Sequence, residues 1–279
     1  MKIKLICDSL CDVPSELVEK YNIDIIPLNI IIGDNEYKEG VDITNDEFYR
    51  RMKEEKVVPK TSQATYIQFK EAFDKYVGEY PIVCITGSSK SSGTYQSAVM
   101  AKNDTEGDVH VFDTLTLSLG SAQFVVKACE LIENNSDITA KEIVDELEHL
   151  RSSVRLYFLP DTLEYLQRSG RASLATATIG QMLNIRPLFT VEDAKIFILT
   201  KIRGKKHIVH TMVDTLIEQY DTLEDKNIII GCGANLGDFE TLKKEVEDRI
   251  KCKNIYFTRG GACICSHTGP DILAISCSN

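Results

Sequence analysis

Polar residues that could bind an anion gather at four places in the chain. These places are Thr61-Ser-Gln63, Ser88 to Thr94, Ser169-Gly-Arg171 and Cys265-Ser-His-Thr-Gly-Pro270. Together they offer hydroxyl groups, backbone N–H groups, one guanidinium and one imidazole, all of which can donate hydrogen bonds to a carboxylate. If they converge at one cleft, they form a carboxylate receptor. Taken singly, each is better explained as an ordinary turn, because Ser, Thr and Gly are common turn residues.

The stretch from Ile82 to Ala98 begins as an apolar strand, continues as a loop of small hydroxyl residues and ends in a helix. Such a loop brings backbone N–H groups, hydroxyl groups and the positive end of a helix dipole to one small volume, which suits an anion. Residues 87–93 lack the Gly-Lys-Ser/Thr ending of a P-loop and the closing glycine of a nucleophile elbow. We therefore predict a loop that holds a carboxylate or a phosphate.

A second interpretation of the same residues is catalytic. Ser92, His267 and Asp113 could supply a nucleophile, a base and an orienting carboxylate. The chain would then be a small-molecule hydrolase or transferase that acts on an anionic substrate through Ser92 and His267. The missing elbow at the nucleophile argues against this alternative.

The histidines and cysteines do not follow the spacing of a metal site. His207 and His210 are three residues apart, but no second pair with zinc-site spacing accompanies them. In Gly231-Cys-Gly-Ala-Asn-Leu-Gly237 the third glycine comes one place too late for a dinucleotide-binding fingerprint. We therefore predict neither a metal nor a cofactor.

The elements that must position these residues divide into two patterns. From residue 1 to about residue 153, strands such as Lys2 to Asp8 and Ile23 to Ile32 alternate with helices, two of which open with capping boxes at Thr44 and Thr139. This alternation predicts an α/β domain (1–153) with a parallel sheet between helices, joined by right-handed crossovers.

From about Val154 the pattern changes. Arg186 to Val191 and Lys195 to Ile202 predict a hairpin around Glu192-Asp-Ala194, which is antiparallel by construction. Ala172 to Leu183 is predicted to be a helix of small residues that can pack closely against a ligand. We expect an α+β domain (154–279) with a mixed sheet, and a ligand at the interface of the two domains.

Composition narrows the class of protein. The chain has 279 residues, 43% of them hydrophobic, with 32 basic and 42 acidic residues and a net charge of -10, which argues against a nucleic-acid-binding protein. The nine cysteines are an odd number and most lie in apolar segments, which indicates reduced core residues and a cytoplasmic location. No apolar run reaches the roughly 18 residues of a membrane helix.

Several blocks of the sequence resemble the signature sequences of the DegV family. They are Cys7-Asp-Ser9, Tyr37-Lys-Glu-Gly-Val-Asp42, Pro59-Lys-Thr-Ser-Gln63, Ser91-Ser-Gly-Thr-Tyr-Gln-Ser-Ala98, Ser169-Gly-Arg171, Ile179-Gly180, Ile185-Arg-Pro187 and Ser266-His-Thr-Gly-Pro270. The blocks occur in order over the whole chain. The resemblance implies a two-domain, non-catalytic protein that binds a long-chain fatty acid and, in bacteria, serves as the acyl-carrying subunit of a fatty acid kinase.

The resemblance also implies which residues bind the ligand. By motif position, the carboxylate would be held by Thr61, Ser92 with the backbone of Gly93, and His267, with Arg171 beside them. Departures from the family pattern bear on chain-length preference and partner choice. They are Ser169, where a glycine is usual, Ala172, Asp271 and Ala64-Thr65.

Three expectations follow for the structure. Thr61, Ser92 and His267 should surround one carboxylate-sized position, and an apolar tunnel should run from it along Ala172 to Leu183 and the hairpin that follows. Arg171 should lie at the rim and engage the kinase, which would supply nucleotide and metal. A transient membrane contact is compatible with this role.

Overall fold

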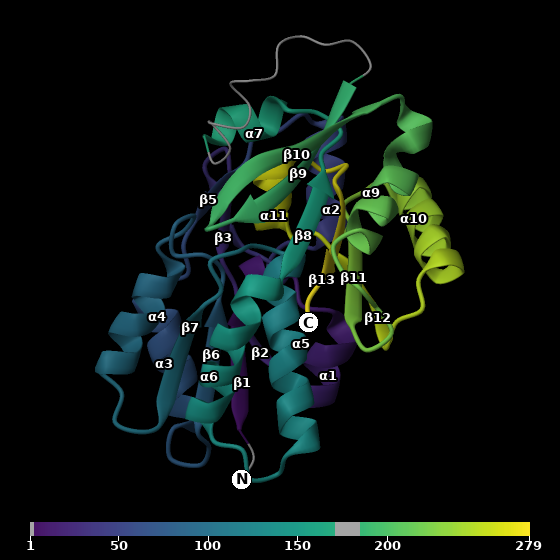
Figure 1. Cartoon of the computed structure of the whole chain (residues 1–279). Coiled ribbons are helices and arrows are strands. Elements are labelled where there is room, and N and C mark those ends of the chain that lie inside the picture. Colours follow the sequence, from purple (N-terminus) through teal and green to yellow (C-terminus); the bar gives the residue numbers. More distant parts are fainter. Residues whose placement is uncertain (1–2, 171–184) are drawn as a thin grey trace.

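The computed structural model describes residues 3–170 and 185–279 (Figure 1). The predicted helix from Ala172 to Leu183, and Arg171 with it, lies outside the described residues.

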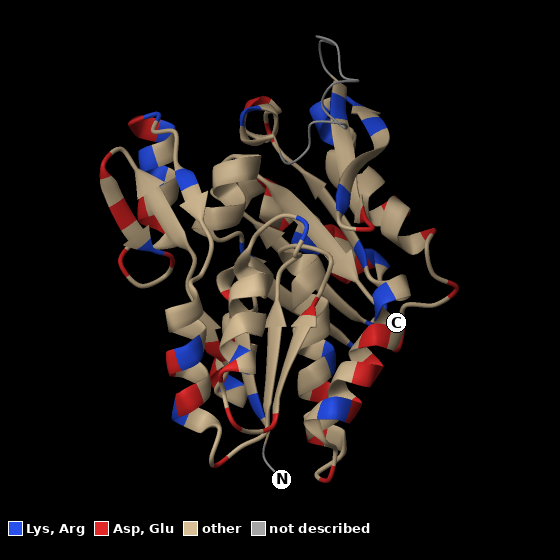
Figure 2. Cartoon of the chain, turned by 90° about the vertical axis from the view of Figure 1, so that its left-hand side faces the viewer, with Lys and Arg blue, Asp and Glu red and all other residues tan. Residues whose placement is uncertain are grey.

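The first half of the chain builds a four-stranded parallel sheet in the order β2-β1-β6-β7, flanked by helices. The strands are β1 (Lys4–Asp8), β2 (Asp24–Ile26), β6 (Ile82–Thr86) and β7 (Val109–Asp113). Every residue of β1 and β6 is buried, as expected where helices cover both faces of a parallel sheet. In Figure 2 the strands at the centre are largely tan, and the charged residues lie mostly on the helices and loops around them. The predicted parallel α/β architecture is confirmed.

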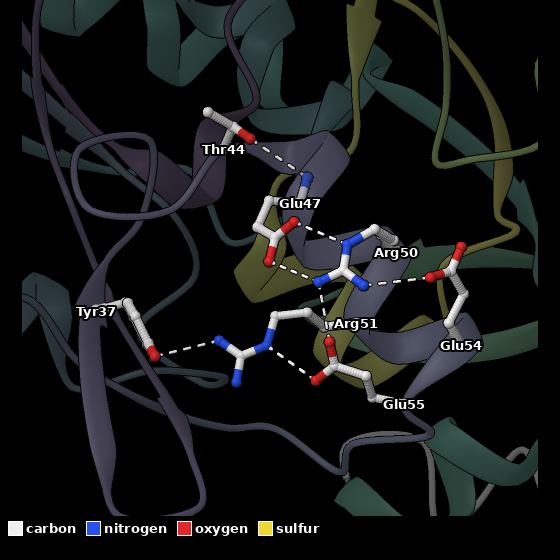
Figure 3. A network of polar contacts seen from close by, with 7 residues as sticks. All are labelled: Tyr37, Thr44, Glu47, Arg50, Arg51, Glu54 and Glu55. Carbon is white, nitrogen blue, oxygen red and sulfur yellow. Dashed lines mark hydrogen bonds and ion pairs between the residues drawn. The ribbon is translucent and has the colours of Figure 1, made fainter.

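Six helices accompany the strands of this half. They are α1 (Ser15–Tyr21), α2 (Asn45–Glu54), α3 (Tyr66–Tyr76), α4 (Thr94–Asn103), α5 (Leu119–Asn134) and α6 (Ala140–Leu150). Three of them, α2, α3 and α6, begin after a threonine whose side chain caps the helix. Thr139 forms the predicted capping box with Glu142. At α2, Thr44 accepts a hydrogen bond from the Glu47 backbone, but the Glu47 carboxylate pairs with Arg50 instead of closing the box (Figure 3).

A second, three-stranded antiparallel sheet in this half was not predicted. It has the order β4-β3-β5, with β3 (Asn29–Ile32), β4 (Asn35–Lys38) and β5 (Lys60–Ser62). The predicted single strand from Ile23 to Ile32 is wrong, because it is divided at Pro27 between two sheets. Proline has no N–H group to donate to a sheet. As a result Thr61 lies on a strand and not in a loop.

The second half of the chain builds a six-stranded sheet in the order β10-β9-β8-β13-β11-β12. The strands are β8 (Arg155–Leu159), β9 (Ile185–Glu192), β10 (Lys195–Arg203), β11 (Asn227–Cys232), β12 (Asn254–Arg259) and β13 (Leu273–Cys277). Only β11 and β12 pair in parallel, whereas the other neighbours are antiparallel. The predicted mixed sheet and its β9–β10 hairpin are confirmed. The described helices of this half are α7 (Glu164–Ser169), α9 (Ile208–Ile217), α10 (Leu236–Arg249) and α11 (Ala262–Thr268).

The two halves share one hydrophobic core. The larger core cluster includes Phe112 and Phe124 of the first half together with Phe158 and Phe189 of the second. Helix α5 contacts both β11 and β13 of the mixed sheet. A smaller cluster packs α9 and α10 against the mixed sheet. The strands of the parallel and mixed sheets separate at the predicted boundary near residue 153, and the domain division itself stays a prediction.

Candidate ligand-binding site

Four of the five predicted site residues line one cavity. It has a volume of about 360 Å³, and Thr61, Ser92, Gly93 and His267 all lie in its wall. Thr61 comes from β5, Ser92 and Gly93 from the loop before α4, and His267 from α11. The cavity therefore draws on both halves of the chain. Arg171 lies outside the described residues.

Thr61 and His267 contact each other directly. The Thr61 Oγ1 atom lies 2.9 Å from His267 Nε2, and the tautomer of the imidazole decides which of the two donates. The bond joins the three-stranded sheet of the first half to α11 of the second. It therefore brings a hydroxyl group and an imidazole to a single point of the cavity wall.

The loop before α4 presents hydroxyl groups at a helix N-terminus. Gly93 is the N-cap residue of α4, where backbone N–H groups and the helix dipole favour an anion. The Ser92 and Thr94 hydroxyl oxygens are 2.8 Å apart. A side chain at Gly93 would collide with the end of the Gln63 side chain, which donates to Ser97 Oγ at 3.0 Å. The glycine thus lets the β5 segment approach the loop.

Most of the cavity wall is apolar. Its apolar residues are Leu10, Leu28, Leu117, Leu156, Phe158, Leu166, Val191, Ile196, Ile264, Ile272 and Ala274. Val191 and Ile196 come from the β9–β10 hairpin, the segment expected to line a tunnel. The cavity thus combines a group of hydroxyl, backbone and imidazole donors with a larger surface that favours a hydrocarbon.

Sequence reasoning assigned no role to Ser118, which also lines the cavity. Ser118 has φ 52° and ψ −128°, a backbone conformation that is essentially confined to glycine. Its N–H group donates to the Leu10 carbonyl at 2.8 Å, and its hydroxyl donates to Asp12. Nothing in the sequence distinguishes this serine from the others of its loop, because the strain arises from tertiary contacts.

The hydrogen bonds of Ser92, His267 and Asp113 do not join them into the triad that the catalytic alternative requires. Asp113 accepts hydrogen bonds from the backbone of Ser89 at 3.1 Å and of Leu115 at 3.0 Å, so its carboxylate orders two loops. Ser92 bonds with Thr94, and His267 Nε2 lies beside Thr61. The Asp113 and Ser92 contacts are therefore structural.

Three buried carboxyl groups behind the cavity were also missed. Burial raises the pKa of Asp8 to about 7, that of Asp12 to about 8 and that of Glu39 to about 7. Asp8 and Glu39 belong to the two family-like blocks at the start of the chain, and Asp12 follows the first block, but the sequence alone does not show that the three are buried together.

The part of the chain that the structure describes contains neither a metal-binding cluster nor a membrane-spanning helix. Within 3–170 and 185–279, no group of three or more His, Cys, Asp or Glu side chains is arranged to hold a metal ion. In the same ranges no helix is long and apolar enough to cross a membrane. All nine cysteines are free thiols, and eight of them are buried.

The fold and the cavity define an α/β protein with a largely apolar, ligand-sized cavity enclosed between a parallel-sheet half and a mixed-sheet half. The model of the family described as "Uncharacterised protein, DegV family" matches residues 2–279. The chain belongs to the DegV family.

Similar proteins cover the whole chain. A DegV domain-containing protein of Caldanaerobacter subterraneus is 31% identical over 98% of this chain and 98% of its own. A DegV lipid-binding protein of Thermotoga maritima is 29% identical, with a TM-score of 0.89 over 100% of this chain and 98% of its own. A DegV family protein of Thermus thermophilus, described for fatty acid binding, is 27% identical, with a TM-score of 0.91 over 100% of both chains.

Proposed function

We propose that this protein binds a long-chain fatty acid in the cavity and presents the carboxylate to a partner kinase. The observation that carries the proposal is that Thr61, Ser92, Gly93 and His267 line the same cavity as eleven apolar residues. The carboxylate would be held at these four residues, with the tail along the apolar wall. The names of the Thermotoga and Thermus relatives support a lipid ligand.

The energetics favour an acyl chain over a small anion. Burial of one methylene contributes about 0.8 kcal/mol, so a chain of roughly fifteen methylenes contributes on the order of 12 kcal/mol before ordering costs. A buried carboxylate is unfavourable unless it is hydrogen-bonded, and each charge-assisted hydrogen bond offsets about 1.5 to 3 kcal/mol. Affinity would therefore come mainly from the tail, and orientation from the head group.

A carrier of this kind needs no nucleophile of its own. The kinase would supply nucleotide and metal, and this chain would remain the non-catalytic subunit. We place it in the cytoplasm, with a transient membrane contact for exchange of the ligand. The free cysteines are compatible with this compartment.

Extraction of the purified protein with organic solvent, followed by mass spectrometry, tests the ligand class. We expect a stoichiometric fatty acid. A protein that contains none, and that does not take up oleate when it is supplied, contradicts the proposal. A small polar anion in place of the acid would favour the hydrolase or transferase alternative.

Arg171 tests presentation separately from binding. We propose that it lies at the rim and engages the kinase or the developing acyl phosphate. Arg171→Ala should then spare oleate affinity and abolish acyl-phosphate formation with added kinase. Loss of binding contradicts the rim position, and full activity in both assays contradicts any role for Arg171.

A further inference from the structure

A cluster of three carboxyl groups, Asp8, Asp12 and Glu39, lies behind the cavity and has no part in the proposed function. Their exposed fractions are 0%, 8% and 6%. All three line a second cavity of about 480 Å³, whose wall also includes Ser15 and Arg259. The carboxyl cluster therefore forms part of the wall of this second cavity.

Two of these carboxyl groups each connect one residue of the ligand-cavity wall to a neighbouring segment of the chain. Asp8 accepts from the N–H groups of Leu10 and Gly87, both at 3.0 Å, and so joins the cavity wall to the start of the loop before α4. Glu39 accepts from the N–H group of Cys263 at 2.7 Å and from the Ser9 hydroxyl. Leu10 and Cys263 line the ligand cavity.

Asp12 connects two parts of the wall that come from different halves of the chain. Its Oδ1 atom accepts from the N–H group of Gly261, the N-cap residue of α11, at 2.8 Å. Its Oδ2 atom bonds with the hydroxyl of Ser118. Helix α11 carries His267 in its last turn. Asp12 thus holds the strained Ser118 segment of the cavity wall against the helix that positions the imidazole.

We propose that Asp12 is a positioning residue of the ligand site, which holds Ser118 and α11 together in its protonated form and releases this arrangement as the pH rises. The inference rests on the proposed function and adds its regulation by protons. In the protonated form Oδ1 still accepts from Gly261, while the Oδ2 hydroxyl donates to Ser118 Oγ. The Ser118 hydroxyl hydrogen can then turn toward the cavity.

Loss of the proton places a charge where burial and the neighbouring carboxyl groups oppose it. Burial raises the pKa of Asp12 most, and Glu39 and Asp8 raise it further. The hydrogen bonds from Ser118 and Gly261 lower it, and the pKa that results is about 8. Asp8 and Glu39 titrate near pH 7, so they ionise in the same range. At higher pH the three carboxyl groups of the cluster therefore carry negative charges that repel one another.

The other titratable groups around Asp12 do not compensate this charge. Burial raises the pKa of the Cys11, Cys263 and Cys265 thiols and of the Tyr49 phenol, so these groups stay neutral. The Arg259 guanidinium on β12 lies 3.1 Å from Asp46 and stacks 5.2 Å from the Tyr49 ring, which directs its charge to the surface. His267 lies at the other end of α11.

The test is the affinity for oleate from about pH 6 to about pH 9, a range in which the ligand carboxylate stays ionised. The comparison is between the unaltered protein and Asp12→Asn, whose amide can accept from Gly261 and donate to Ser118 as the protonated acid does. We expect the unaltered protein to lose about tenfold in affinity across this range, equivalent to one pKa unit of coupling. Asp12→Asn should lose distinctly less affinity over the same range, because only Asp8 and Glu39 of the carboxyl cluster still ionise in it.

Every group other than Asp12 is the same in both proteins, so the difference between the two profiles isolates Asp12. Oleyl alcohol is the matched uncharged ligand. It should show the same pH dependence as oleate in the unaltered protein, because positioning acts on the cavity and not on the ligand charge. Parallel profiles for the two proteins, or a pH effect confined to oleate, would overturn the inference.

A second measurement needs no variant. Calorimetry of oleate binding near pH 8, in buffers of different ionisation enthalpy, should show net proton uptake on binding. No uptake overturns the inference even if Asp12→Asn does not fold. Binding that is tight but independent of pH overturns the inference and leaves the proposed function standing, whereas no binding of oleate at any pH contradicts the proposed function itself.

Discussion

Two polar regions meet at helix α11, one half-buried in the cavity wall and one buried behind it, and they differ in the hydrogen-bonding groups that they present. The proposed head-group end of the cavity, at Thr61, Ser92 and His267, presents hydroxyl groups and an imidazole, which can donate to an anion. The carboxyl cluster presents acceptors that already receive hydrogen bonds from backbone and side-chain donors. The first region suits a ligand from outside, whereas the second is completed by the protein itself.

Because of this difference, we expect substitutions in the carboxyl cluster to affect stability and substitutions at the proposed head-group end to affect ligand binding. Removal of an acceptor from the carboxyl cluster should leave buried donors without partners and destabilise the fold. Removal of a donor from the head-group end should weaken ligand binding and leave the fold largely unchanged.

The largest effect is expected for Glu39→Ala. The change leaves the Cys263 N–H group and the Ser9 hydroxyl short of an acceptor, so the free energy of unfolding should fall by about 2 kcal/mol. Chemical denaturation measures it. The control is Glu36→Ala on the exposed face of β4, with an expected change within about 0.5 kcal/mol. Equal stability of the two variants would contradict the structural role of the carboxyl cluster.

The pH dependence of stability should follow from the same three carboxyl groups. Their pKa values are raised in the folded protein, to about 7 and about 8, so the folded state binds more protons than the unfolded state from about pH 5 to about pH 8. Stability should therefore fall as the pH rises through this window, by at most about 1.4 kcal/mol per unit for each group.

Asp12→Asn removes one of these three contributions. Its free energy of unfolding should change less steeply with pH than that of the unaltered protein. Denaturation curves at several pH values measure both slopes. Identical slopes, or a stability that rises with pH in this window, would show that Asp12 does not titrate as the structure indicates.

Ser92→Ala tests the proposed head-group end of the cavity. Loss of a hydroxyl that donates to a carboxylate should lower oleate affinity by about tenfold, equivalent to about 1.4 kcal/mol. Ser89→Ala is the control, since Ser89 belongs to the same loop and does not line the cavity. Fluorescent-ligand displacement measures both. If Ser89→Ala weakens binding as much, the effect comes from the loop and not from the head-group contact.

The smallest effect is expected in the tail region. Val191→Phe should shift the bound acids toward shorter chains, because each methylene that no longer fits weakens binding by about 0.8 kcal/mol. Leu199→Phe is the control on the same hairpin, since Leu199 is exposed and does not line the cavity. Mass spectrometry of extracted acids compares them. The same acid profile in both variants would refute the assignment of this wall to the tail.

Periodicity in the sequence was enough to predict the two kinds of sheet. The alternation of strands and helices before residue 153, and the hairpin around Asp193, both depend on local patterns that the structure confirms. Pro27 shows the limit of this reasoning. An apolar run on either side of it was predicted as one strand, although a residue without an N–H group divides it between two sheets.

Only some of the residues in and behind the cavity wall could be predicted from the sequence. We could name Thr61, Ser92 and His267 from the polar residues and the family-like blocks. The residue type alone shows that a hydroxyl or an imidazole can donate a hydrogen bond. Ser118 and Asp12 could not, because their significance lies in a strained backbone and in burial, which arise only when distant segments pack together. Short polar strands such as β5 were missed for the same reason.

A crystal structure of the protein with bound oleate tests the central claim most directly. The account predicts that the ligand carboxylate lies within about 3.2 Å of Thr61 Oγ1 and Ser92 Oγ, beside His267, with the tail along Phe158 and Val191. A carboxylate that lies among the apolar residues of the cavity wall, away from Thr61, Ser92 and His267, or an acid bound elsewhere on the protein, would contradict it.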